Sequence, residues 1–257
     1  MKIALFQSDI EWCNKEKNFA VAREKVKEAK NKGCSVIFFP EMSFTGFSMA
    51  TEVTAESDTK TLDFVTSLAK EYSIYIGFGY VKKVNGKCEN HYCVVDYRGE
   101  VISDYTKIHP FSAGYENENF VGGNSITHYR IEGINFSTFI CYDLRFPEVF
   151  SAVGDRAEVI VVPANWPKSR SHHWKTLLKA RAIENQCYIL GVNCVGVHDD
   201  IYYSGDTMAV NPDGEVIAER SNIQDLLIVE INKDANTYRE KFDSRTDRRP
   251  ELYKTLM

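Results

Sequence analysis

Three side chains that could do chemistry stand just beyond apolar, strand-like segments of this 257-residue chain. Cys141 directly follows one such segment, Lys107 directly follows another, and Glu41 follows a third after a single proline. A thiol is a nucleophile, a carboxylate can take up its proton, and an ammonium can stabilise an oxyanion. Amide hydrolysis by a thiol requires these three functions, so this chemistry is the first hypothesis that the sequence raises.

Each of the three residues also has a plainer interpretation. A free cysteine is most often a small buried hydrophobe, and a glutamate or lysine after a strand is most often a solvated charge. The catalytic interpretation is stronger for the three residues taken together than for any one of them. Ligands of α/β sheets bind beyond strand ends, so three such groups can meet in one pocket. No histidine stands in a motif typical of cysteine proteases, and the chain has no Gly-x-Ser-x-Gly elbow.

The segments that must position these residues alternate between strand and helix early in the chain. Apolar, β-branched runs predict strands, and helical spacing of apolar residues predicts helices. The predicted strands are residues 3–6, 36–39, 74–81, 93–97, 101–105, 134–140, 159–163, 188–195, 207–210 and 226–230. The predicted helices are residues 18–30, 59–72, 147–153 and 173–185. Residues 107–124 lack a sustained period and hold three glycines, which indicates a long functional loop.

Hairpin signals interrupt this alternation in the middle of the chain and near its end. The strongest is Asn85-Gly86, the dipeptide that two-residue hairpin turns prefer. A purely parallel sheet is therefore not expected, and a layered α/β fold with mixed sheets fits better. We expect residues 1–257 to form a single domain, because no linker or repeat divides them. From about residue 238 the tail is charged and rich in arginine, which predicts a surface arm or a partner-binding extension.

The composition excludes several classes of function. The net charge is −5, and no basic patch indicates binding to nucleic acid or to an anionic membrane. The apolar runs are too short to span a bilayer, and the amino-terminal apolar stretch is too short for a signal peptide. Seven cysteines without a secretory leader predict free thiols and a cytoplasmic protein. His172, His173 and Cys187 lack zinc-ligand spacing, so we expect no metal and no cofactor.

Three blocks of sequence resemble a known family. Residues 39–47 (FPEMSFTGF), 104–110 (DYTKIHP) and 140–147 (ICYDLRFP) are similar, in order and spacing, to the catalytic blocks of the nitrilase, or carbon–nitrogen hydrolase, superfamily. The resemblance continues to the carboxyl-terminal part of the chain. It runs through residues 164–167, 173–174, 180–185 and 204–207.

This resemblance implies a four-layer αββα sandwich with two mixed β-sheets, usually assembled as a homodimer. It also implies Glu41 as the general base, Lys107 as the oxyanion stabiliser and Cys141 as the nucleophile. A second glutamate is expected in the loop after the lysine. Glu116 is the candidate, and Glu118 stays open as the alternative.

Within the superfamily, the chain resembles the bacterial ω-amidases. The motifs that carry this resemblance are residues 39–42 (FPEM), 45–47 (TGF), 141–147 (CYDLRFP), 164–167 (ANWP) with Arg170 after them, and 239–242 (REKF). That resemblance implies release of ammonia from the distal amide of 2-oxoglutaramate or 2-oxosuccinamate, through a cysteine thioester. Another small-amide hydrolase or an N-carbamoyl amine hydrolase of the same superfamily is the alternative. A catalytically silent interaction protein on the same scaffold is a third interpretation, which the presence of all three catalytic side chains disfavours.

Five further residues are expected around the substrate. Arg170 is the candidate for binding a substrate carboxylate, with a solvated loop arginine as the alternative. Arg145 is the rival, although we expect it to brace the turn after Cys141 through a buried ion pair. The backbone N–H of Tyr142 is expected to bind the oxyanion, and Trp166 and Phe47 to form pocket walls, with ordinary core packing as the competing interpretation.

Overall fold

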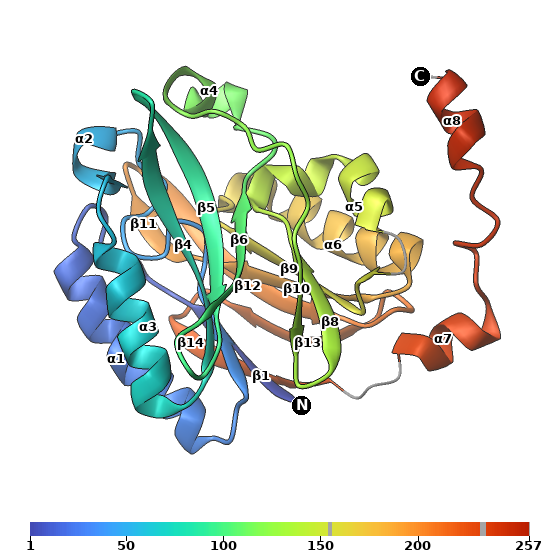
Figure 1. The fold of residues 1–257 in the computed structure, drawn as a ribbon, viewed down its shortest axis with the longest axis horizontal. Helices are drawn as coiled ribbons and strands as arrows, with labels where there is room; N and C mark the ends of the chain where they lie inside the picture. The colour runs from blue at the N-terminus through green and yellow to red at the C-terminus, as the bar shows by residue number, and fades with distance from the viewer. Residues whose placement is uncertain (154–155, 232–234, 257) are drawn as a thin grey trace.

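Two mixed β-sheets lie face to face, and helices cover the outer face of each sheet (Figure 1). The computed structural model describes residues 1–153, 156–231 and 235–256. The predicted four-layer αββα sandwich is therefore confirmed, as is the expectation that the sheets are mixed rather than purely parallel.

The first sheet has the strand order β14-β1-β2-β4-β5-β6, with β3 beside β4. Its strands are β1 (Lys2–Gln7), β2 (Val36–Phe38), β3 (Ala55–Glu56), β4 (Tyr75–Val84), β5 (Lys87–Val95), β6 (Val101–Thr106) and β14 (Asp225–Glu230). Helices α1 (Lys15–Asn31) and α3 (Lys60–Tyr72) cover its outer face (Figure 1).

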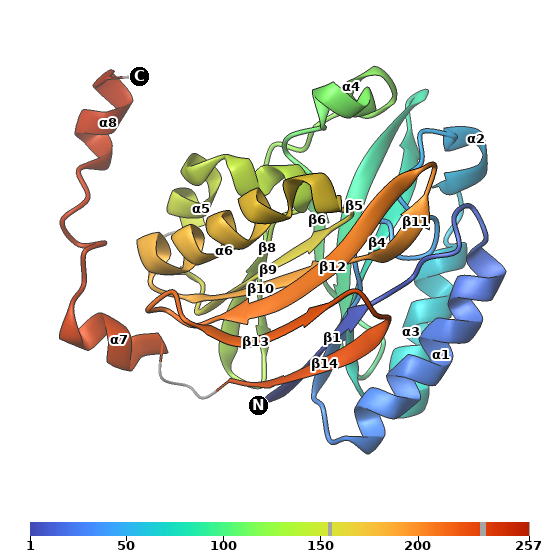
Figure 2. The same cartoon turned by 180° about the vertical axis from the view of Figure 1, so that it is seen from behind.

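The second sheet has the order β11-β12-β10-β9-β8-β7, with β13 beside β12. Its strands are β7 (His128–Ile131), β8 (Ile134–Thr138), β9 (Val159–Ala164), β10 (Tyr188–Asn193), β11 (Val195–His198), β12 (Ile201–Val210) and β13 (Val216–Ser221). Helices α5 (Pro147–Val153) and α6 (Ser171–Asn185) lie on its outer face, as the view from behind shows (Figure 2).

Alternate residues of the inner strands serve two different cores. In β2, Val36 and Phe38 belong to the core between the sheets, and the Phe38 ring centroid lies 6.2 Å from that of Phe136 on β8. Ile37, between them, packs in the core under α1 and α3. Because side chains alternate across a strand and both faces are buried, the strand appears in the sequence as a continuous apolar run.

The turn at Asn85-Gly86 is confirmed as a two-residue hairpin, since Val84 pairs with Lys87 and both turn residues have positive φ. The single strand expected over residues 188–195 is wrong, because it ends at Asn193 and β11 begins at Val195. Asn193 is the last residue of β10 and still pairs with Ala164, and its side chain exchanges hydrogen bonds with the backbone of Trp166 at this strand end. Strand β13 was missed because most of its side chains are exposed, so no apolar alternation marks it.

The arginine-rich tail is more than a solvated arm. Arg239 is buried and donates from Nη2 to the carbonyl of Ala157 at 2.7 Å. Arg248 donates from Nη2 to the carbonyl of Glu184, in the last turn of α6, at 2.7 Å. Arginines near a helix end commonly satisfy its free carbonyl groups. These contacts tie the tail to the body, whereas its last helix stands clear of it (Figure 1).

The remaining helices are short. They are α2 (Thr51–Thr54), α4 (Glu116–Asn119), α7 (Ala235–Lys241), α8 (Pro250–Leu256) and the 3₁₀-helices η1 (Ser112–Gly114), η2 (Cys141–Arg145) and η4 (Lys168–Arg170). Among the described residues, no helix is both long and apolar enough to cross a bilayer. The expected homodimer stays a prediction.

Candidate active site

The ends of three strands bring the predicted catalytic side chains to one place. Glu41 follows β2, Lys107 is the first residue after β6, and Cys141 opens η2 just beyond β8. The Lys107 ammonium lies 2.8 Å from Glu41 Oε1 and 2.8 Å from Glu116 Oε2. The alternative glutamate, Glu118, is exposed, so Glu116 is the one that the fold places in this cluster.

A glycine shapes the turn that carries Glu41. Strand β4 passes so close that a Cβ on Gly79 would lie 2.4 Å from the backbone nitrogen of Met42. Two hydrogen bonds hold the turn against β4. Ser43 N donates to Gly79 O at 3.0 Å, and Gly79 N donates to Ser43 Oγ at 2.7 Å. Only glycine permits this approach, and it leaves the Glu41 side chain fully buried.

The turn at Cys141 is held by a buried carboxylate. Cys141 has a φ of +45°, a conformation that a side chain rarely adopts without support. Asp143 Oδ2 accepts from Ile140 N at 3.0 Å and from Tyr105 Oη at 2.9 Å. Its Oδ1 accepts from His109 N at 2.9 Å and lies 2.7 Å from His109 Nδ1. Asp143 therefore ties Ile140, the residue before the thiol, to Tyr105 and His109.

We expect Asp143→Asn to destabilise the protein by about 2–4 kcal/mol, because the new NH₂ group would face hydrogen-bond donors in a fully buried position. Urea unfolding measures the loss. Asp213→Asn, at an exposed turn position, is the matched control and should change stability by less than about 0.5 kcal/mol. Equal stability of the two variants would remove Asp143 from this role.

The charges in the cluster act on one another. Burial alone would lower the pKa of the Lys107 ammonium, but Glu116 and Glu41 outweigh burial and hold that pKa raised. Burial raises the pKa of the Cys141 thiol, Glu41 raises it further, and Lys107 opposes them. The thiol is thus protonated at neutral pH, and it needs a base if it is to attack.

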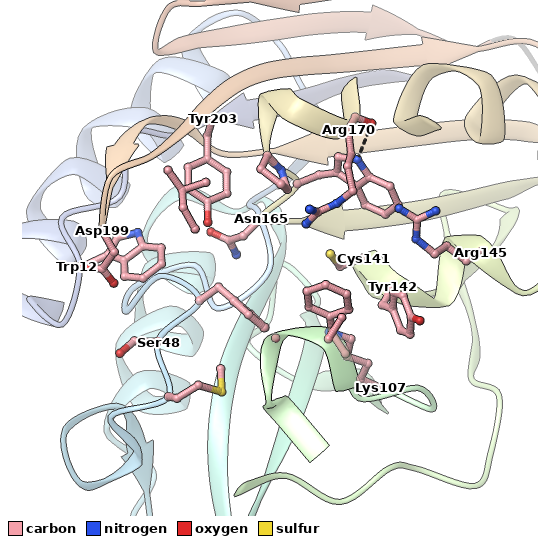
Figure 3. Close-up of a pocket in the computed structure, with 18 residues that line it drawn as sticks. Trp12, Ser48, Lys107, Cys141, Tyr142, Arg145, Asn165, Arg170, Asp199 and Tyr203 are labelled. Carbon is pink, nitrogen blue, oxygen red and sulfur yellow. Dashed lines mark hydrogen bonds between the residues drawn. The ribbon is translucent and has the colours of Figure 1, made fainter. Parts of the chain in front are cut away.

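A cavity of about 490 Å³ opens over the thiol (Figure 3). The sequence-predicted residues Phe47, Tyr142, Trp166 and Arg170 all line it, together with Lys107 and Cys141. Its other walls are formed mainly by Trp12, Ser48, Met49, Phe111, Asn165, Asp199, Ile201 and Tyr203. The two glutamates are not among the lining residues and are fully buried, so only the lysine and the thiol of the cluster reach the cavity.

The prediction that Arg145 braces the turn after Cys141 through a buried ion pair is wrong. Its guanidinium carbon lies 4.7 Å from the Trp166 ring centroid and the side chain lines the cavity, where burial and the charge of Arg170 lower its pKa. None of the ion pairs found among residues 1–153, 156–231 and 235–256 involves Arg145 or Arg170. The buried arginine that does contact the turn is Arg181, whose Nη2 donates to Leu144 O at 2.9 Å.

Two residues of the site were missed in the sequence. Asn165 N donates to Glu41 Oε2 at 3.0 Å, and its Nδ2 donates to Glu41 O at 2.7 Å. Asn90 Nδ2 donates to both Glu41 and Glu116. Asn165 had a signal, since it follows an apolar strand as the catalytic residues do. Asn90 lies inside β5, and nothing in the sequence marked it as a site residue.

Within the described residues, no cluster of three or more His, Cys, Asp or Glu side chains could hold a metal ion.

Known proteins resemble this chain over nearly its whole length. Residues 2–240 match the family model described as carbon-nitrogen hydrolase. A 2-oxoglutaramate amidase of Bacillus subtilis is 31% identical over 98% of this chain and 98% of its own length. The ω-amidase YafV of Escherichia coli strain K12 is 32% identical over 96% of each chain. A CN-hydrolase superfamily protein from Xanthomonas campestris has the same fold, with a TM-score of 0.91 at 24% identity over 97% of each chain.

Proposed function

The chain belongs to the carbon–nitrogen hydrolase family, and on this premise we propose that it releases ammonia from the distal amide of short 2-oxo dicarboxylate amides. 2-Oxoglutaramate and 2-oxosuccinamate are the proposed substrates. The observation that carries the proposal is the pair of arginines, Arg145 and Arg170, beside the thiol in one cavity. The similarity to a 2-oxoglutaramate amidase supports it.

In the proposed reaction, Glu41 takes the proton of Cys141 as the sulfur attacks the amide carbon. The C–S bond forms, and the carbonyl oxygen becomes an oxyanion. When the C–N bond breaks, Glu41 returns its proton to the nitrogen, so that ammonia leaves and a thioester stays on Cys141. A water that gives its proton to Glu41 then attacks the thioester, and the thiol recovers a proton as the acid is released.

Lys107 is proposed to bind the oxyanion. Its ammonium has three protons, of which two point to Glu41 and Glu116. Because Lys107 also lines the cavity, the third is free to reach the carbonyl oxygen of a substrate bound at Cys141. The backbone N–H of Tyr142, in the first turn of η2, is the proposed second donor. Glu116 would act as a fixed anion that keeps Lys107 charged and oriented.

The far end of the substrate is proposed to bind the two arginines. Figure 3 shows both side chains close to the Cys141 sulfur. Like charges this close to each other, on a wall with aromatic rings, favour an anionic ligand that neutralises both. Arg170 lies over the Phe111 ring, with its guanidinium carbon 5.6 Å from the ring centroid, and both residues line the cavity. A carboxylate is the matching group.

We expect Arg170→Ala to raise KM for 2-oxoglutaramate by about 10-fold or more, since it removes charged hydrogen bonds to the carboxylate. For a simple aliphatic amide, KM should change far less. Lys168→Ala removes an exposed charge from the same short helix and outside the cavity, so it controls for a general effect of charge. Equal KM changes for the charged and the neutral amide would remove Arg170 from this role.

An N-carbamoyl amine or another small amide is the alternative substrate. Asp199 favours an N-carbamoyl amine with a second, free amino group, because this carboxylate lines the cavity beside Trp12, away from the arginines (Figure 3), and matches the charge of a distal ammonium. Ammonia release should be measured for 2-oxoglutaramate, glutamine, asparagine, an aliphatic amide, a nitrile and a carbamoyl amine. Preference for the carbamoyl amine would overturn the first proposal and support the alternative.

A further inference from the structure

We propose that Asn90 is a positioning residue that keeps Glu41 and Glu116 ionised at the same time around a single lysine. The inference rests on the proposed function, because it explains how Glu41 can act as a base at neutral pH. Asn90 does not line the cavity and is buried, so it acts through the glutamates rather than on a substrate.

The geometry of the cluster is nearly symmetrical. Asn90 Nδ2 donates to Glu41 Oε1 at 2.9 Å and to Glu116 Oε1 at 3.0 Å. Each glutamate also accepts from the Lys107 ammonium and from one backbone N–H group, that of Asn165 for Glu41 and that of Phe111 for Glu116. Each carboxylate thus has three donors, and two of these three are shared between the glutamates.

The shared donors have an electrostatic purpose. Two carboxylates beside one ammonium leave a net charge of −1 in a fully buried place. Like charges in such a site normally cause one of the carboxylates to keep a proton. Hydrogen bonds donated to a carboxylate favour its charged form. A primary amide supplies two such bonds without adding charge, which a serine or an aspartate cannot do.

The orientation of the Asn90 amide supports this interpretation. Its Oδ1 is buried and has no hydrogen-bond partner among the described residues. An unsatisfied buried acceptor is costly, yet the reverse orientation would place that oxygen against two carboxylates. The backbone of Asn90 joins the cluster as well, because its carbonyl accepts from Lys107 N at 2.8 Å.

The other titratable side chains that face Glu41 do not compete with it between pH 5 and pH 8. Burial raises the pKa of Cys141, of Cys194 and of Tyr203, and Glu41 adds to each shift. These three groups therefore stay neutral, and Lys107 stays charged, over the range in which the effect of Asn90 is measured.

The experiment compares Asn90→Asp with Asn90→Ala. The aspartate has the shape of asparagine but adds a third carboxyl group, so it should lower kcat/KM more than alanine, which should lower it by about 10- to 100-fold. In both variants the acid limb of the pH–rate profile should move to higher pH, because Glu41 then holds its proton more tightly. Ser103→Ala removes a buried hydroxyl of the same sheet that bonds to Thr127 rather than to the cluster, and it should leave the profile unchanged.

A second measurement needs no substrate. The loss of stability in Asn90→Ala should be larger at pH 8 than at pH 5, because a lost donor matters most to an ionised carboxylate. A purely structural role predicts a different pattern. The loss of stability would then be the same at both pH values, the pH–rate profile would not move, and the isosteric aspartate would be milder than alanine. That pattern would overturn the proposal. Rates are measured on whichever amide the unmodified protein hydrolyses, so a different substrate preference would leave this test intact.

Discussion

Replacing Cys141 with alanine should lower ammonia release from 2-oxoglutaramate by about 10⁴-fold or more, as loss of a catalytic nucleophile does in other hydrolases. Among the described cysteines, Cys141 is the one whose thiol both lines the cavity and interacts electrostatically with the Glu41–Lys107–Glu116 cluster. Its pKa is raised by burial and by Glu41, so the sulfur attacks only where Glu41 can take the proton.

Two measurements check the role of Cys141. Ammonia release gives the rate, and hydroxylamine added during turnover should trap the proposed thioester as a hydroxamate in the unmodified protein alone. Cys34→Ala is the matched control, since Cys34 is a buried cysteine packed under α1 and α3, and it should keep full activity. Activity of Cys141→Ala within 10-fold of the unmodified protein would sink the assignment.

The sequence was a good guide to the parts of the fold whose two faces are both buried. Continuous apolar runs mark such strands, and the place where a run stops marks a strand end. Glu41 and Cys141 could therefore be located before any contact was known, whereas Lys107 follows the partly exposed strand β6 and was found from its strand-end position together with the family resemblance. Strand β13 shows the limit, because its exposed side chains depend on pairing with β12 for their conformation and carry no pattern of their own.

The finer features of the site depend on tertiary contacts. Glu116 and Glu118 are two residues apart on α4, so they point to opposite sides of the helix, and only the packing of that helix decides which one meets Lys107. Arg145 follows the thiol closely in sequence, yet it turns to the cavity, and Arg181 from α6 contacts the turn instead. Asn90 lies in a strand without any local sign of function.

Replacing Lys107 with methionine should lower kcat/KM by about 10²–10³-fold, because the oxyanion loses a donor. It should also destabilise the fold by about 3–5 kcal/mol, since two buried carboxylates would lose the cation between them. The folded variant would have to bind a proton that the unfolded chain does not hold at neutral pH. Its stability should therefore rise as the pH falls towards 5.

Urea unfolding at pH 5 and pH 8 measures this dependence. Lys60→Met, which breaks an exposed ion pair with Glu16, is the control and should change stability by less than about 1 kcal/mol at either pH. The double variant Lys107→Met with Glu116→Gln separates the two effects, because it removes one carboxylate charge without supplying an oxyanion donor. Stability should recover while activity stays low. If activity recovered with stability, Lys107 would serve only to hold the fold, and another group would have to bind the oxyanion.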